Sequence, residues 1–224
     1  MKKQQRTYAV VAAVVIVIVI GGVATAYFMN RTDTSADTMA GMDHSKMNMS
    51  SSESDTYKKY AALKGEAYDK EFVANMIVHH ESAMNMAEMA LAVAKHQEIK
   101  DLATSINVSQ GQEIGDMRKW QTEWGYPATS GHMMTGMEEA GHSMESMSDM
   151  NEALKGLSGD AFDKKFLELM IEHHQGAIDM AKPAETNAAH QEVKDLAQAI
   201  IDAQTKEIRE MKQWQIEWGY GRTP

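Results

Sequence analysis

Apolar and polar positions along most of this chain repeat at helical spacing. Over residues 72–94, apolar side chains recur at steps of three and four, which places them on one face of an α-helix. A second stripe with the same period covers residues 102–124, and Gly125 follows it as the expected C-terminal cap. The sequence shows no strand-like alternation. The pattern therefore predicts an all-α fold in which two helices meet at a turn near His96.

The same unit occurs twice. Residues 65–126 align without a gap with residues 159–220, and about half of the paired positions are identical, including an adjacent His-His pair. Helices joined by a short turn pack antiparallel, so two tandem hairpins predict an antiparallel four-helix bundle. Pro183 stands where the first copy has Met89. Because proline removes a helical hydrogen bond, we expect the first helix of the second copy to bend or end near Lys182.

The hairpin predicts which residues face one another. If the turn centres on His96, residues equally far from it on either side are level, because both helices rise equally per residue. This pairs Phe72 with Trp120 and places His79 level with Glu113. The second copy repeats this arrangement. We therefore expect the first His of each pair to lie beside the Glu.

Histidine and methionine gather around this layer. Neighbouring His residues project about 100° apart on a helix, so one is expected to face the core and the other a groove. Imidazole with thioether suits a soft or borderline ion, above all Cu(I). A buried His–Glu hydrogen bond that sets the register, with Met as core filler, explains these residues equally well. The candidate ligands are Met76, His79, His80, Met86, Glu113 and Met117, with Met170, His173, His174, Met180, Glu207 and Met211 in the second copy.

Two further groups of Met and His precede the two copies. Ser, Thr, Asp, Gly and Asn surround them, so neither stretch is expected to form a core. A flexible segment gains little from exposing apolar Met, whereas clustered thioethers and imidazoles can wrap Cu(I) or Ag(I), and we favour metal capture over filler. The residues are Met39, Met42, His44, Met47 and Met49, then His132, Met133, Met134, Met137, His142, Met144 and Met147.

The N-terminus is a targeting segment. Basic residues 1–6 precede an uncharged apolar run, residues 8–28, of about the length that crosses a bilayer. The basic flank predicts that the rest of the chain lies outside the cytoplasm, anchored or secreted. Residues 24–26 also fit a signal-peptidase site, but the run is long for a signal peptide and we favour an uncleaved anchor. In both cases the segment engages the membrane or the export machinery.

These signals divide the chain. Residues 1–28 are the anchor or signal peptide, 29–56 a Met/His-rich linker, 57–126 the first hairpin, 127–150 a second Met/His-rich linker and 151–224 the second hairpin. At the hairpin ends, Trp120 and Trp124 are predicted core aromatics, and Tyr126 is expected to pack nearby. His96 and its counterpart His190 are interpreted as helix-end residues stabilised by the helix dipole rather than as exposed ligands.

The amino-acid composition indicates which kinds of molecule or ion this protein binds. The formal net charge is −10 and the acidic residues are spread along the helices, so no basic surface for nucleic acid is indicated. The chain has no Cys and 20 Met. Outside the cytoplasm thiols tend to oxidise to disulfides, whereas the thioether of Met cannot form one. This composition is consistent with soft-metal binding in an oxidising compartment.

The second His-His segment, MIEHHQGAIDMA at residues 170–181, resembles the hallmark of the DUF305 family. Residues 76–87 are a looser copy, and the Gln-x-x-Glu-Ile-x-x-Met motifs at 110–117 and 204–211 also fit. The resemblance implies a ferritin-like four-helix bundle. Because family members include extracytoplasmic copper-binding proteins, it also implies binding of Cu(I), with silver as a second ion, for copper tolerance, buffering or trafficking.

Carried onto this chain, the resemblance names His79, His80, Met76, His173, His174 and Met170 as ligand candidates. The first copy departs from the motif at Glu81 and Ser82, and the second at Pro183. These departures predict two unequal sites.

Three function classes remain open. We favour a copper-binding protein without enzymatic activity, which exchanges metal ions with a copper donor or acceptor protein. A ferritin-like di-iron oxidase needs Glu-x-x-His on facing helices, and the only such spacing, Glu139 to His142, lies in the linker. A structural or interaction bundle would show no dependence on metal.

Overall fold

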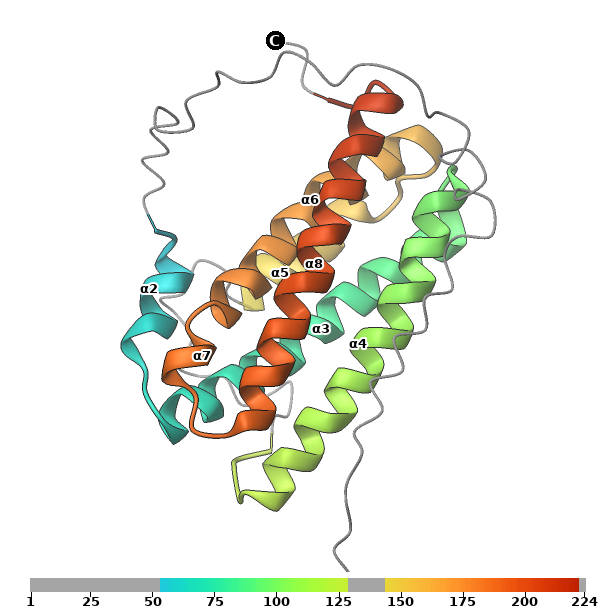
Figure 1. The fold of residues 1–224 in the computed structure, drawn as a ribbon. Coiled ribbons are helices and arrows are strands. Elements are labelled where there is room, and N and C mark those ends of the chain that lie inside the picture. Colours follow the sequence, from blue (N-terminus) through green and yellow to red (C-terminus); the bar gives the residue numbers. More distant parts are fainter. Residues whose placement is uncertain (1–52, 129–143, 222–224) are drawn as a thin grey trace, which may run out of the picture. The chain divides into compact units, whose positions relative to one another are not determined.

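The computed structural model describes residues 53–128 and 144–221. The regular elements in these ranges are helices (Figure 1), with one isolated bridge between Gly65 and Ala188. The helices are α2 (Asp55–Ala62), α3 (Glu66–Val93), α4 (Gln97–Glu123), α5 (Met144–Leu154), α6 (Gly159–Ala181), α7 (Ala184–Asn187) and α8 (Gln191–Glu217). The prediction of an all-α helical bundle is confirmed.

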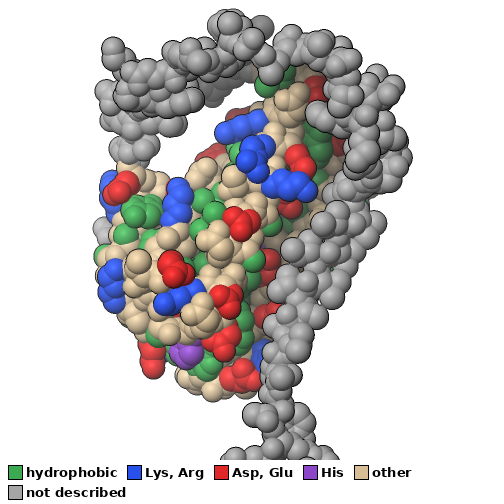
Figure 2. Space-filling view, viewed as in Figure 1, with side chains coloured by type: hydrophobic (Ala, Val, Ile, Leu, Met, Phe, Trp, Pro, Cys, Tyr) green, Lys and Arg blue, Asp and Glu red, His purple; other side chains and the backbone are tan. Residues whose placement is uncertain are grey.

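The predicted anchor or signal peptide, residues 1–28, lies outside the described residues. Within the ranges that are described, no helix is both long and apolar enough to cross a membrane. On the face shown in Figure 2, acidic side chains are spread over the helices rather than gathered at one point.

Two long hairpins build the bundle. α3 packs along α4 and α6 along α8, and the two hairpins meet mainly through α3 and α6. The first turn comprises residues 94–96, as predicted. Gly125 follows α4 with φ +67°, a left-handed conformation that glycine adopts at little cost, and it caps the helix as predicted.

Pro183 interrupts the second repeat. α6 ends at Ala181, and the short helix α7 begins after the proline. The expected break near Lys182 is therefore confirmed. Tyr68 of the first hairpin donates a hydrogen bond from its hydroxyl to the carbonyl of Met180 at 2.8 Å. That carbonyl lies in the last turn of α6, where a helix leaves its carbonyl groups without a partner of its own.

The apolar core consists of two clusters, one on each side of the His-His pairs. One cluster takes the first half of α3 and the second halves of α4 and α6, and it includes Tyr68, Phe72 and Ile77. The other takes the second half of α3 and the first half of α6, and it includes Phe162 and Phe166. Each cluster contains residues of both hairpins. Burial in either one therefore holds the hairpins together.

Helix α5 lies where the sequence predicted a flexible linker reaching Met150. It packs against α3 and α6, and Met147 and Met150 are only 5% and 6% exposed. Met147, Met150 and Leu154 recur at steps of three and four, so one face of a short helix can bury all three. The linker prediction was therefore wrong for residues 144–150. Met147 is a core residue and not an exposed ligand, and Met144 begins the helix.

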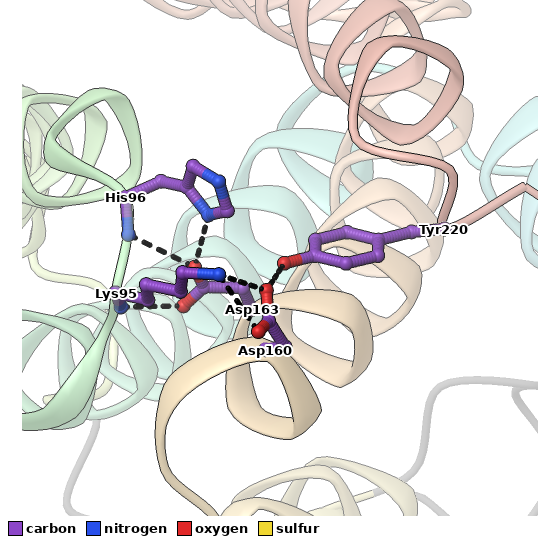
Figure 3. A network of polar contacts seen from close by, with 5 residues as sticks. All are labelled: Lys95, His96, Asp160, Asp163 and Tyr220. Atoms are coloured by element: carbon purple, nitrogen blue, oxygen red, sulfur yellow. Dashed lines mark hydrogen bonds and ion pairs between the residues drawn. The ribbon is translucent and has the colours of Figure 1, made fainter.

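Each hairpin turn is held by a buried aspartate of the other hairpin. Asp163 of α6 accepts hydrogen bonds from the backbone N–H groups of Lys95 (3.0 Å) and His96 (2.9 Å), and its carboxylate lies 2.6 Å from His96 Nδ1 (Figure 3). Asp69 of α3 makes the matching contacts with Ala189 and His190. Both aspartates are fully buried. We call each such contact a turn clasp.

Tryptophan completes each clasp. His96 stacks on Trp218 with ring centroids 3.8 Å apart, and His190 stacks on Trp124 at the same distance. Tyr126 packs edge-on against this second stack, as expected of a helix-end aromatic. The two histidines are helix-end residues, as predicted. Aspartate and tryptophan, however, supply the contacts that the prediction assigned to the helix dipole.

Candidate functional site

All four residues of the two His-His pairs are buried. His79 is 1% exposed, and His80, His173 and His174 are fully buried. The expectation that one residue of each pair faces a groove was therefore wrong. Each of α3 and α6 packs against its own partner helix and also against the other hairpin, so two adjacent positions can both be buried while Glu172 and Gln175 remain exposed.

The glutamates contact the second His of each pair. His80 Nε2 lies 2.7 Å from Glu113 Oε2, and His174 Nε2 lies 2.7 Å from Glu207 Oε2. The prediction that His79 lies beside Glu113 was therefore wrong by one residue. One residue changes the direction of a side chain by about 100° for only 1.5 Å of rise, so a small error in register exchanges the two roles.

The first His of each pair lies between the hairpins. The ring centroids of His79 and His173 are 3.6 Å apart, with the planes inclined by 39°. Each ring lies 6.5 or 6.3 Å from that of its neighbour, His80 or His174. The four imidazoles thus form one layer, with two in contact at the centre and two turned toward the glutamates.

Six methionines lie on the two sides of this layer. Each cluster receives two from one hairpin and one from the other. All six are at most 4% exposed. The sets are Met76, Met117 and Met180 in one cluster, and Met170, Met211 and Met86 in the other. The six methionines predicted as ligands on the long helices are therefore core residues, placed in the two clusters that flank the histidine layer.

Several buried polar atoms near this layer make no hydrogen bond to any described residue. They are His80 Nδ1 and Gln110 Oε1 in the first repeat, and His174 Nδ1 and Gln204 Oε1 in the second. Buried polar groups are nearly always satisfied, so an orphaned atom calls for a water, an ion or another explanation. The same two positions are orphaned in both repeats. An imidazole nitrogen of this kind is a suitable donor for a metal ion.

The donor set restricts the kind of ion. Among the described residues, no three His, Asp or Glu side chains lie close enough together to hold a metal. The contact between His79 and His173 also leaves no space for an ion between the two rings. Metal–nitrogen bonds of about 2 Å on opposite sides of an ion would separate the ring centroids by about 6 Å. A soft ion with few ligands, imidazole and thioether, fits better than a hard ion.

Met39, Met42, His44, Met47 and Met49 lie outside the described residues, as do His132, Met133, Met134, Met137 and His142.

Sequence reasoning assigned no role to the buried Asp69 and Asp163, or to Gln110 and Gln204. Asp69 and Asp163 are identical at matching positions of the two copies, as are Gln110 and Gln204. In the structure they are at most 3% exposed. A polar residue repeated within the apolar stripe of both copies was the signal that could have identified them.

A protein-family model and several solved structures match most of this chain. The family model "Domain of unknown function (DUF305)" matches residues 23–91 and 69–215. The Cu(I)-bound structure of CopM is 36% identical with a TM-score of 0.56, and the match covers 68% of this chain and 98% of CopM. CopM has also been solved in Cu(II)-bound and Ag-bound forms.

A DUF305 protein from Streptomyces coelicolor, described as a candidate secreted protein, is 30% identical with a TM-score of 0.60. The match covers 70% of this chain and 96% of that one. A search of curated proteins finds no match.

Proposed function

Because the chain belongs to the DUF305 family, we propose that it is an extracytoplasmic protein that binds Cu(I), and Ag(I) as a second ion. It would buffer copper or pass it to an acceptor protein, without catalysing a reaction. Ligation would rest on methionine and histidine, in a ferritin-like bundle and in the Met/His-rich linkers.

The similarity to CopM carries this proposal. It covers 98% of the CopM chain at 36% identity, and CopM structures hold Cu(I), Cu(II) or Ag. In this chain, the fully buried Met76 and Met170 lie one helical turn before His80 and His174, whose Nδ1 atoms are orphaned. Thioether and imidazole are ligands that Cu(I) and Ag(I) prefer.

The proposal involves two groups of ligands. The linker residues, on segments without a predicted core, would capture the ion first. The helical residues, His80 with Met76 and His174 with Met170, would retain it. Thioethers bind metal without losing a proton, so the sites should keep their affinity at mildly acidic pH better than sites built of His alone.

Two alternatives remain distinct from copper binding. A di-iron oxidase would need several carboxylates around each metal pair, and the described residues offer one glutamate beside each His pair. A purely structural bundle would use the His–Glu contacts for register. It would give no reason for orphaned imidazole nitrogens at matching positions.

A competition titration tests the proposal. The purified chain in mild detergent is titrated against a chromophoric Cu(I) chelator under reducing conditions, and we expect it to withdraw copper from micromolar chelator complex. Failure to compete would exclude the copper function. If the chain competes, replacing the linker Met and His residues, and separately His80 with His174, determines which group binds. Oxidase turnover with added iron would instead support the enzyme.

A further inference from the structure

We infer that Glu113 and Glu207 are positioning residues, and that Nδ1 rather than Nε2 of His80 and His174 is the nitrogen presented to the metal. The inference rests on the proposed function, since it concerns how that site is built. It also changes the role of the two glutamates, which the sequence offered as ligands.

The hydrogen-bond geometry fixes the tautomer. A carboxylate oxygen only accepts hydrogen bonds, and Glu113 Oε2 lies 2.7 Å from His80 Nε2. Nε2 must therefore carry the hydrogen and donate it to the glutamate. In a neutral imidazole the other nitrogen, Nδ1, then has the lone pair. A metal-binding histidine commonly donates its second ring N–H to a carboxylate in this way.

Burial separates the two nitrogens of each ring. The glutamate side chains are 22% and 17% exposed, so the carboxylates lie at the edge of the bundle. The imidazoles are fully buried, and their Nδ1 atoms have no hydrogen-bond partner in the part of the chain that is described. Nε2 is thus occupied at the edge of the bundle, while Nδ1 keeps an unused lone pair in the interior.

The neighbouring thioethers favour the same nitrogen. Met76 precedes His80 by four residues and Met170 precedes His174 by four, a spacing that puts each pair on one face of its helix. Both methionines are fully buried. If the His–Glu contact served register alone, a buried acceptor beside apolar core would cost stability without compensation. A soft ion at Nδ1 explains why both repeats retain it.

Nitrogen-15 NMR of histidine-labelled full chain tests this directly. In the metal-free protein, the ring coupling pattern should report hydrogen on Nε2 of His80 and His174. Ag(I) is then added, because a bound silver nucleus splits the signal of the nitrogen it touches. We expect this splitting on Nδ1 of both residues. Splitting on Nε2, or only on linker histidines such as His44, would overturn the inference while leaving metal binding intact.

Variants test the role of the carboxylates. Glu113→Ala combined with Glu207→Ala should give a mixture of tautomers and weaken Ag(I) binding at these histidines by about 10–100-fold, the range found when such an outer partner is lost. Glu123→Ala is the control, because Glu123 is an exposed residue of α4, the helix that carries Glu113, and pairs with Lys119 at the surface. That control should leave tautomer and affinity unchanged.

The outcomes remain distinguishable. Unchanged tautomers and affinity in the double variant would overturn the positioning role. If the unmodified chain bound neither Ag(I) nor Cu(I), the proposed function itself would be refuted. If the double variant fails to fold, the tautomer and the silver splitting of the unmodified chain still decide which nitrogen binds.

Discussion

The two ends of the bundle share one buried contact and differ at their surfaces. Both ends have a turn clasp in which a buried aspartate holds the other hairpin's turn, and a histidine stacks on tryptophan. Only one end adds Lys95, which pairs with Asp160 at 2.8 Å, while Tyr220 donates to the same carboxylate (Figure 3). At the other end, Ala189 stands in the place of Lys95 and Glu66 in the place of Asp160.

This difference indicates which contacts hold the fold together. A buried aspartate that accepts hydrogen bonds from two backbone N–H groups and contacts one imidazole cannot be lost without breaking all three contacts. A surface ion pair can be lost at little cost, because water replaces it. Since both repeats keep the clasp and only one has the Lys95–Asp160 ion pair, we expect the clasp to contribute more than the ion pair to the docking of the hairpins, beside the apolar core that they share.

Removing either clasp should have the largest effect. Asp163→Ala and Asp69→Ala should each lower the free energy of unfolding by about 3 kcal/mol, because each removes three contacts of one fully buried carboxylate. Chemical denaturation followed by far-ultraviolet circular dichroism measures this. Asp116→Ala, an exposed residue of α4, serves as control and should change stability by less than about 0.5 kcal/mol. A large loss at one end and none at the other would contradict the equivalence of the clasps.

A middle-sized effect is expected where the repeats differ inside the core. Tyr68 faces the end of α6, whose Met180 carbonyl it satisfies, whereas its counterpart Phe162 has no hydroxyl and the matching helix α3 is uninterrupted. Tyr68→Phe should therefore cost about 1 kcal/mol, the usual worth of such a hydrogen bond. Pro183→Met, which restores the residue type of the first repeat, should reduce that cost in a double-mutant cycle. Purely additive losses would show that Tyr68 and Pro183 are independent.

Local rules predicted much of the fold. The helices, the turn at residues 94–96, the cap at Gly125 and the break at Pro183 follow from periodicity and from the backbone limits of glycine and proline. The predicted histidine partner of Glu113 was wrong, because residue spacing alone does not fix the alignment of two helices to within one residue. Helix α5 was missed because its low-complexity composition hid a short apolar face.

Contacts between the hairpins could not be predicted. No sequence pattern indicates which face of α3 meets α6, so the contact of His79 with His173 and the clasp between Asp163 and His96 emerge only from the packed structure. Identical residues in the two repeats did mark the buried layer. Their chemistry pointed to a soft ion, but the identity of the donor atoms required the hydrogen bonds of each imidazole.

The smallest effect should come from the surface contact that only one end possesses. Hydrogen bonds from Lys95 and then Tyr220 lower the pKa of Asp160 below its ordinary value of about 4. A carboxyl group whose pKa is lower in the folded state stabilises the fold above the unfolded value, and this contribution disappears as the pH falls through the folded value. Asp160→Asn should therefore lose slightly more stability at pH 6 than at pH 3. Because the group is exposed, added salt should shrink the difference at pH 6. Glu66→Gln is the matched comparison, because Glu66 pairs with Lys70 of its own helix rather than with a lysine of the other hairpin. If the free energy of unfolding depended equally on pH in both variants, the Lys95–Asp160 ion pair would add no stability of its own. The two ends would then differ in sequence but not in stability.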